Sequence, residues 1–190
     1  MARPITNHPE DALHRAMDLF WSRGYRDVSV DDLVQLTGLN RHSLYAHYGS
    51  KFGLAREALR LYCDESARRL GTIFAETSSP TERLRQFMHL RAPDGTDSWW
   101  AKMLERGCFA VRMSTELRAE SAEISSMVAS GMSAILHRLA DVIRAGQSVG
   151  QFRSDRKAED LATMVYSAWL AALLLPPDAE VEGAVLSLLT

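Results

Sequence analysis

Residues 29 to 54, SVDDLVQLTGLNRHSLYAHYGSKFGL, constrain the fold more than any other part of this chain. Ser29 is a suitable helix N-cap, and Asp32 three residues later completes a capping-box pattern. Gly38 predicts a sharp turn, because glycine accepts the left-handed backbone that ends many helices. Asn40 is expected to cap a second short helix directly after this turn. Two short helices joined by a tight glycine turn predict a helix-turn-helix.

The second helix, predicted over residues 41–47, carries polar groups that suit a nucleic-acid interface. Leu44 and Tyr48 are expected to face inward. Arginine pairs with guanine edges or phosphates, and hydroxyl and imidazole groups bind phosphate oxygens. A lysine near the start of the following helix adds its charge to the helix dipole. The sequence predicts that DNA contacts come from Arg41, His42, Ser43 and Tyr45, and that phosphates are anchored by Ser29, His47 and Lys51.

The sequence around this motif resembles the N-terminal domain of TetR-family transcriptional regulators over roughly residues 10–60. Three segments at the family spacing carry the resemblance: ALHRAMDLFWSRGY, then SV, then TGLNRHSLYAHYGSK. The chain departs from the usual pattern at Asn40, where serine is common, and at Gly49, where proline is common. Phe52 and Gly53 also stand where an acidic residue and alanine are usual. These departures bear on operator preference and on the fourth helix more than on the fold.

Apolar residues recur with helical spacing along the whole chain, and no segment shows the two-residue period of a strand. The first helix is predicted over residues 10–23, where Gly24 ends the apolar pattern. The clearest loop is expected at residues 92–97. Further helices are predicted over residues 50–75, from Pro80 onward, and over 98–117, 119–145, 156–175 and 179–190.

These elements predict an all-α protein of about nine helices. A three-helix helix-turn-helix head is joined by a long fourth helix to a larger helical body. The DNA-binding domain is expected over residues 1–54, with the first few residues a disordered or flexible arm. The effector-binding and dimerisation domain is expected over residues 55–190.

Composition is that of a soluble protein expected to stay in the cytoplasm. Hydrophobic residues make up 46% of the sequence, and no run of about 18 apolar residues predicts a membrane span. The first residues lack the apolar stretch of a secretion signal, and two cysteines suit a reducing compartment. The net charge of −2 would not by itself suggest DNA, so affinity has to come from where the charges point.

Residues 161–175, LATMVYSAWLAALLL, are apolar almost all round, so a helix there is buried on more than one side. The pattern fits an internal core helix or a dimer interface. The resemblance favours the dimer, because TetR-like regulators pair through their last two large helices. A two-fold homodimer also presents two recognition helices to a palindromic operator. The residues expected in the interface are Leu161, Val165, Ala168, Trp169 and Ala172.

Methionine and aromatic residues gather in the sequence of the body, and such side chains adapt to varied apolar ligands. Core packing explains any one of them, but together they favour a pocket for a small-molecule effector of unknown identity. Two adjacent tryptophans directly after the predicted loop are the first choice for a gate or wall. The predicted pocket residues are Phe87, Trp99, Trp100, Met103, Cys108, Phe109, Met113, Tyr166 and Trp169.

Cys108 lies in ERGCFAVRMSTEL, which resembles a segment of a TetR subgroup that responds to reactive electrophiles or small metabolites. The resemblance implies a sensor role, because in some members the corresponding cysteine is the sensor. Arg112, four residues later on the expected helix, would favour the thiolate. The other interpretation is a small buried apolar side chain, and this interpretation is favoured for Cys63.

The sequence contains no common catalytic or metal-binding motif. Its histidines and cysteines show no C-x-x-C, H-x-x-x-H or H-E-x-x-H spacing, and no Walker A, G-x-G-x-x-G or G-x-S-x-G string occurs. No catalytic residue, metal or cofactor is expected. We therefore expect a ligand-responsive repressor that binds double-stranded operator DNA as a homodimer. Two alternatives stay open: a small-molecule-binding protein or enzyme with a vestigial helix-turn-helix, and a DNA binder without an effector.

Overall fold

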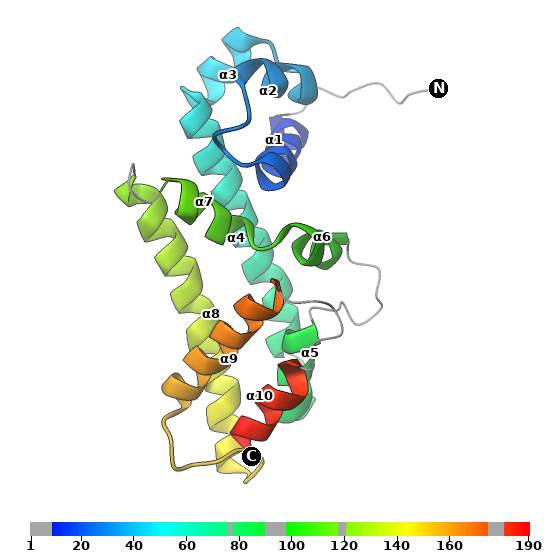
Figure 1. The fold of residues 1–190 in the computed structure, drawn as a ribbon. Coiled ribbons are helices and arrows are strands. Elements are labelled where there is room, and N and C mark those ends of the chain that lie inside the picture. Colours follow the sequence, from blue (N-terminus) through cyan, green and yellow to red (C-terminus); the bar gives the residue numbers. More distant parts are fainter. Residues whose placement is uncertain (1–8, 76–77, 90–97, 118–120, 175–180) are drawn as a thin grey trace. The chain divides into compact units, whose positions relative to one another are not determined.

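The computed structural model describes residues 9–75, 78–89, 98–117, 121–174 and 181–190. Within these ranges all regular secondary structure is α-helical, which confirms the predicted fold class (Figure 1). The helices are α1 (Pro9–Arg23), α2 (Val30–Thr37), α3 (Arg41–Tyr48), α4 (Lys51–Ala75), α5 (Pro80–His89), α6 (Ser98–Arg106), α7 (Phe109–Leu117), α8 (Ala122–Ser148), α9 (Ala158–Ala172) and α10 (Val181–Leu189). The predicted N-terminal arm and the predicted loop at 92–97 lie outside the described residues.

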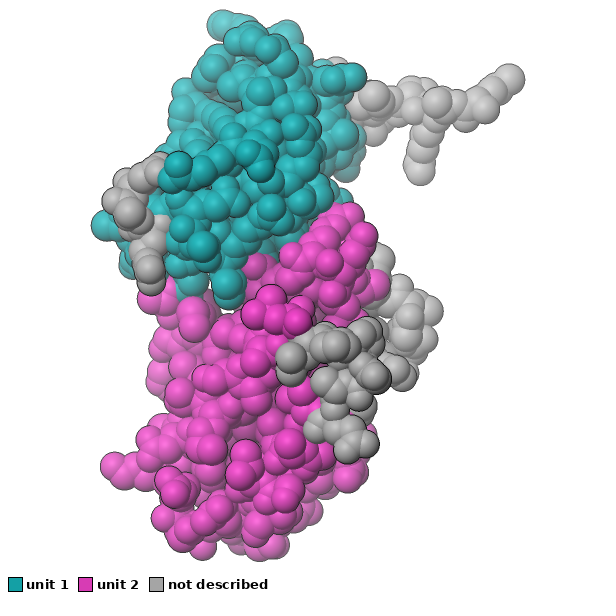
Figure 2. Space-filling view, viewed as in Figure 1, with its two compact units in different colours: residues 1–65, 109–128 teal, residues 66–108, 129–190 magenta. Residues whose placement is uncertain are grey.

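The chain forms two compact units, which are coloured separately in Figure 2. Unit 1 comprises residues 1–65 and 109–128, and unit 2 comprises residues 66–108 and 129–190. α4 and α8 therefore contribute residues to both units, and α7 belongs to the same unit as α1, α2 and α3. The predicted division of function between residues 54 and 55 stays a prediction, because grouping by contacts does not test which segment carries which function.

The core of unit 1 is built around α1. Met17, Phe20 and Trp21 lie on one side of this helix and are buried. The Trp21 ring meets the Tyr62 ring of α4 edge-on, with 5.1 Å between centroids, and lies 6.3 Å from the Phe109 ring of α7. Tyr62 and Phe109 are themselves 5.5 Å apart. Three helices thus share one aromatic cluster, and burial of each large apolar side chain contributes roughly 1.5–3 kcal/mol.

Polar contacts also join α7 to the end of α1. The Glu116 carboxylate accepts a hydrogen bond from the backbone N–H of Arg26 at 3.0 Å, and the Arg26 guanidinium donates to the Glu116 carbonyl oxygen at 3.1 Å. Arg112 donates to the carbonyl oxygen of Trp21 at 3.2 Å. Gly24 has a φ of 91°, and a Cβ there would lie 2.4 Å from the Glu116 carboxylate. Gly24 therefore ends α1 as predicted, and it also leaves room for this carboxylate.

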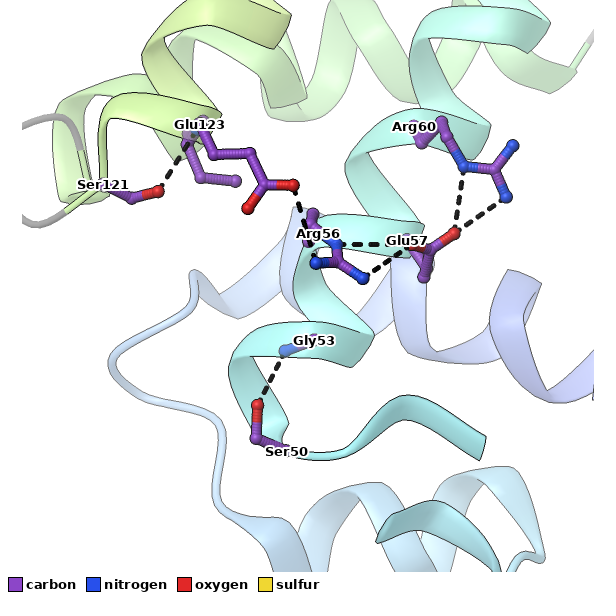
Figure 3. A network of polar contacts seen from close by, with 8 residues as sticks. Ser50, Gly53, Arg56, Glu57, Arg60, Ser121 and Glu123 are labelled. Carbon is purple, nitrogen blue, oxygen red and sulfur yellow. Dashed lines mark hydrogen bonds and ion pairs between the residues drawn. The ribbon is translucent and has the colours of Figure 1, made fainter. Parts of the chain in front are cut away.

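Ion pairs connect the first turns of α4 with the start of α8 inside unit 1 (Figure 3). The Arg56 guanidinium lies 3.1 Å from the Glu57 carboxylate and 3.5 Å from that of Glu123. The Arg60 guanidinium also pairs with the Glu57 carboxylate, at 2.8 Å. The hydrogen bond from Arg60 is the largest cause that holds the pKa of Glu57 below its ordinary value. Ser121 Oγ accepts a backbone hydrogen bond at 3.2 Å from the first turn of α8. These partly exposed pairs orient the two helices more than they stabilise the fold.

Unit 2 has a separate aromatic stack, formed by α4, α5 and α9. The Phe87 ring stacks on Phe74 at 5.8 Å and on Trp169 at 5.3 Å. Trp169 in turn stacks on Tyr166 at 5.6 Å. Phe87, Tyr166 and Trp169 are all buried, so this stack is part of the hydrophobic core of the unit.

One predicted helical stretch, residues 98–117, is divided into two helices. Gly107 has a φ of 75°, and its N–H donates to the carbonyl oxygen of Met103 at 2.9 Å. This is a left-handed helix end of the kind that glycine favours. The break accounts for the described residues containing ten helices where about nine were predicted. The ends of the other predicted helices agree with the structure to within about one helical turn.

Gly53, in the first turn of α4, packs against the end of α3. A Cβ at this position would lie 1.9 Å from the backbone oxygen of Tyr48, so backbone would have to move. We expect Gly53→Ala to lower the free energy of unfolding by about 1–3 kcal/mol, the range of overpacked sites, although alanine is the better helix former. Denaturant unfolding followed by circular dichroism measures the change.

Gly183→Ala in α10 is the matched control, because a Cβ there would meet no atom within 4 Å. Its stability should equal that of the wild type or exceed it by up to about 1 kcal/mol through helix propensity. If Gly53→Ala is as stable as the wild type, the junction between α3 and α4 has room for a methyl group and the packing argument is wrong.

Candidate nucleic-acid interface

α2 begins with a complete capping box. Ser29 Oγ accepts a hydrogen bond from the Asp32 backbone N–H at 3.0 Å, and the Ser29 backbone N–H donates to the Asp32 carboxylate at 2.8 Å. Ser29 Oγ also donates to this carboxylate at 2.5 Å. These hydrogen bonds lower the pKa of Asp32 to about 2. The largest cause is the bond from the Ser29 hydroxyl, followed by the bond from the Ser29 backbone N–H and the bond from the Arg23 side chain. The capping box predicted from the sequence is confirmed.

The turn between α2 and α3 also has the predicted geometry. Gly38 has a φ of 73°, and its N–H donates to the Val34 carbonyl oxygen at 3.1 Å. Asn40 caps α3, because its side-chain oxygen accepts the Ser43 backbone N–H at 2.8 Å. Gly49 ends α3 with a φ of 74°. Glycine adopts this positive φ readily, whereas proline, which is common at this position in the family, cannot. The helix-turn-helix is therefore confirmed as a local structure.

Arg15 and Thr37 hold α2 on α1, and sequence reasoning singled out neither residue. The Arg15 guanidinium donates to the Thr37 carbonyl oxygen at 2.8 Å. Thr37 is buried, and its hydroxyl donates to the Leu33 carbonyl oxygen at 2.6 Å. A lone arginine on α1 carries no sequence signal, because only the packing of the two helices brings Thr37 within its reach.

α3 presents a polar and aromatic face to solvent, and its buried Leu44 packs into the core on the opposite side. Leu44 is fully buried, as predicted, whereas Tyr48 is only half-buried. Tyr45 is 43% exposed, so part of its ring is accessible to a partner. The other side chains predicted to contact DNA from this helix are exposed at Arg41, His42 and His47 and half-buried at Ser43.

Arg41 forms an ion pair with Asp31 across the turn. The two side chains meet at 2.6 Å and remain 57% and 78% exposed. The hydrogen bond from Asp31 raises the pKa of Arg41 further above its ordinary value, so this guanidinium is always charged. The sequence did not reveal this pair, since its members lie ten residues apart and meet only through the fold of the turn. An exposed ion pair of this kind contributes little to the stability of the fold, so Arg41 can leave Asp31 and bind a phosphate instead.

His47 and Lys51, both predicted to anchor phosphates, have intramolecular contacts. A ring nitrogen of His47 lies 2.8 Å from the carbonyl oxygen of Ser43. The Lys51 ammonium lies 4.4 Å from the centre of the Tyr25 ring, a cation–π contact. Burial lowers the pKa of Lys51 below its ordinary value. The contacts orient both side chains, while their roles toward phosphate stay predictions.

The residues predicted to line one effector pocket are divided between the two units. Phe109 and Met113 belong to unit 1, where Phe109 packs on Trp21 and Tyr62. The others belong to unit 2. All nine are buried except Cys108, which is half-buried. Burial fits both core packing and a closed pocket, so the predicted pocket stays a prediction.

Cys108 lies between α6 and α7 and not on a helix. The expectation that it shares a helix with Arg112 is therefore wrong, because Gly107 ends one helix and Phe109 begins the next. The Arg112 guanidinium instead bonds the carbonyl oxygens at the end of α1. A sensor role for Cys108 stays a prediction, but Arg112 no longer supports it. Cys63, on α4, is half-buried as well.

α9 and α10 line a shallow apolar groove of about 70 Å³ in unit 2. Three residues predicted for the dimer interface, Leu161, Val165 and Ala168, line this groove. Trp169 is instead buried in the aromatic stack. Ala172 is half-buried at the end of α9.

Four groove residues were not predicted from the sequence, and two of them are exposed; the four are Met164, Val185, Leu188 and Leu189. Met164 of α9 is 44% exposed and Leu188 of α10 is 52% exposed, whereas Leu161 and Val165 are almost fully buried within the chain. The apolar surface open to a partner therefore comes mainly from Met164 and Leu188. For α9 the sequence pattern could not separate the exposed from the buried positions, because residues 161–175 contain no charged side chain.

The described residues include no helix long and apolar enough to cross a membrane. They also include no group of three or more histidine, cysteine, aspartate or glutamate side chains arranged to hold a metal ion.

Two family models match the chain. The model of bacterial regulatory proteins, tetR family, matches residues 12–58, which include the helix-turn-helix. The model of the tetracyclin repressor-like C-terminal domain matches residues 80–176. Together these matches cover the helix-turn-helix and most of the helical body.

Known proteins of this kind resemble the chain in sequence and in fold. The HTH-type transcriptional repressor ComR of Escherichia coli (strain K12) is 33% identical over 129 residues, which cover 67% of this chain and 60% of ComR. The regulatory protein TetR from Rhodobacter sphaeroides has the same fold with a TM-score of 0.82, at 21% identity over 95% of this chain and 98% of its own. A cysteine mutant of the TetR-family regulator CifR, solved with 26-bp double-strand operator DNA, matches with a TM-score of 0.76 at 23% identity over the full length of both chains.

The lowered pKa of Asp32 predicts how the capping box responds to mutation and to pH. Because ionised Asp32 is favoured in the folded state, its contribution to stability is present above about pH 4 and is lost as the pH falls toward 2. We expect Ser29→Ala to raise the pKa of Asp32 toward 3.8, since the Ser29 hydroxyl is the largest cause of the shift. An NMR titration of the side-chain carboxyl carbon measures this pKa.

Arg23→Gln is the comparison variant for this titration. It should raise the pKa of Asp32 by less than Ser29→Ala does, because the Arg23 hydrogen bond is a smaller cause than either bond from Ser29. An unchanged pKa in Ser29→Ala, or a larger rise in Arg23→Gln, would contradict the hydrogen-bond geometry described for this cap.

Proposed function

Because the chain belongs to the TetR family of bacterial regulatory proteins, we propose that it is a DNA-binding transcriptional repressor that acts on a palindromic operator in the cytoplasm. The observation that carries the proposal is the exposed polar face of α3, held on the buried Leu44. A helix of this kind fits the major groove of DNA. ComR is a transcriptional repressor, and CifR is a regulator solved with operator DNA. Nothing in the described site favours an enzyme.

In this proposal α3 is the recognition helix. His42 and Tyr45 face base edges or sugars, and Arg41 exchanges its contact with Asp31 for one with DNA. Lys51, at the first position of α4, adds a positive charge where the helix dipole also attracts phosphate. Its contact with the Tyr25 ring keeps the ammonium close to the helix start.

We propose a homodimer that pairs through its last two large helices, α8 and α9, with α10 beside α9. Met164 and Leu188 expose large apolar surface beside the groove that Ala168 lines, and a second copy would cover this surface. A two-fold pair presents two recognition helices, which matches the symmetry of a palindromic operator.

Regulation by a small molecule follows from the same proposal. α4 and α8 each contribute residues to both units, so a ligand bound in unit 2 acts on helices that also belong to unit 1. Such a ligand weakens DNA binding only if its affinity differs between the DNA-bound and released states. Covalent modification of Cys108 by an electrophile is one proposed input, and a non-covalent ligand among the buried aromatic residues is the other.

Two substitutions on α3 test the DNA-binding proposal. We expect Arg41→Ala and Tyr45→Ala each to weaken operator binding by about 1–3 kcal/mol, the range of single contacts to a base. The operator is first selected from a random double-stranded DNA library with the wild-type protein. Fluorescence anisotropy at several salt concentrations then measures the affinities, since a substitution that removes a phosphate contact also lowers the salt dependence of binding.

Arg153→Ala is the control for these variants, because Arg153 is a half-buried arginine of unit 2 that pairs with Asp155. It should bind the operator as the wild type does. Failure of the wild-type protein to select any sequence would instead support a small-molecule-binding protein with a vestigial helix-turn-helix. Unchanged affinity in both α3 variants would remove the assignment of α3 to the groove.

Assembly is tested at Ala168. We expect Ala168→Arg to place an unpaired charge in the groove between α9 and α10 and to convert the dimer to a monomer at micromolar concentration. Operator affinity should fall with it, because one head then has to bind alone. Sedimentation velocity measures the oligomeric state, and anisotropy measures the affinity.

Ala67→Arg provides a control of the same chemical change, because Ala67 is an exposed alanine of α4 that does not line the groove and lies outside α8, α9 and α10. It should remain a dimer. A wild-type protein that sediments as a monomer, or an Ala168→Arg variant that stays dimeric, would contradict the proposed interface.

A further inference from the structure

Unit 2 contains a cavity of about 280 Å³ that is open to solvent and is lined by residues of α4, α5 and α8. Its lining combines apolar side chains, Phe74 and Val142, with two guanidinium groups, those of Arg83 and Arg138. None of these residues belongs to the pocket that the sequence predicted. Ligand sites typically combine an apolar wall with a few polar groups that converge on one point, and this cavity has that composition at the small end of the usual size range.

Arg83 brings a hydrogen-bond donor to the cavity that the protein does not use. Its side chain is half-buried, and its Nε is buried without a hydrogen-bond partner among the described residues. A buried donor left unpaired destabilises a fold, so such groups are usually satisfied by protein, by water or by a ligand. Arg83 also lines the cavity, so the part of its guanidinium that faces the cavity can donate to an acceptor placed there.

Arg138 reaches the same cavity from α8, and a glycine on α4 leaves space for it. A Cβ on Gly71 would lie 3.2 Å from Nη1 of Arg138, closer than most such contacts. Glycine inside a helix is less stable than alanine, so its presence in α4 needs a reason. With glycine at this position, the end of the Arg138 side chain lies close to the α4 backbone without a steric contact.

The charges around the cavity favour an anion with a single charge. Asp141 is the carboxylate in the lining, and it already pairs with Arg144 at 2.7 Å. The two guanidinium groups of Arg83 and Arg138 therefore outweigh the negative charge at the cavity. Asp141 would still repel a dianion such as phosphate more strongly than a monoanion.

We propose that this cavity binds a small monocarboxylate that carries an apolar tail. Its carboxylate lies between Arg83 and Arg138, whose planar guanidinium groups match two carboxylate oxygens. Its tail lies against Phe74 and Val142. The assignment rests on unit 2 alone and does not depend on DNA binding.

Isothermal titration calorimetry with three probes tests the chemical class. Hexanoate supplies both the carboxylate and the tail, 1-hexanol supplies the tail alone, and inorganic phosphate supplies the anion alone. Hexanoate should bind the wild-type protein at one site per chain, at least about tenfold more tightly than either other probe, since hydrogen bonds to charged groups are the stronger ones. Absence of hexanoate binding, or equal binding of 1-hexanol, would overturn the proposal.

Two variants place the ligand in this cavity. Arg83→Gln and Arg138→Gln should each weaken hexanoate binding by about tenfold, because each removes a charged hydrogen-bond donor. Arg85→Gln is the control on the same helix, since Arg85 pairs with Glu82 and Glu182 and does not line the cavity. It should bind hexanoate as the wild type does. Thermal unfolding of each variant shows whether it is folded.

Hexanoate affinities equal to the wild type in both folded cavity variants would overturn the site. An equal loss in Arg85→Gln would overturn it as well, because general positive charge would then explain the binding. Operator binding, measured separately, decides the proposed function, so a failure of one proposal is distinguishable from a failure of the other.

Discussion

The packing of Trp21 against Tyr62 and Phe109 is the contact on which the architecture of unit 1 depends. These rings come from α1, α4 and α7, which are far apart in the sequence, and all three are buried. Their burial brings α7 into the same core as the helix-turn-helix. Without it, α1 would have no apolar partner on this side, and a head of three short helices would bury too little surface to be stable alone.

The contacts of α7 also bear on how regulation could reach DNA. Glu116 and Arg112 form hydrogen bonds with backbone groups at the end of α1 and just after it. α7 cannot slide along α1 without breaking these hydrogen bonds. Arg56 adds a link between α4 and α8 through Glu123. A displacement of α7 or of the start of α8 would therefore change contacts that hold the head.

Unit 2 separates two kinds of chemistry on its helices. The groove beside Met164 and Leu188 is apolar, and an apolar surface of this kind is best covered by another apolar surface. The cavity beside Arg83 and Arg138 is apolar on one side and cationic on another, which suits a small amphipathic anion. α9 is therefore proposed to serve assembly, α4 and α5 to serve ligand binding, and α8 to serve both.

The sequence by itself determined the helical fold class and the local structure of the helix-turn-helix. The cap at Ser29, the turn at Gly38 and the cap at Asn40 are predictable because each depends on contacts within a few residues. Only the tertiary structure decided that Phe109 packs in the core of unit 1 and that Arg83 shares a cavity with a residue of α8. Helical periodicity identifies the apolar face of a helix but not the face that it meets, because pairing between distant segments depends on the shape and volume of whole side chains.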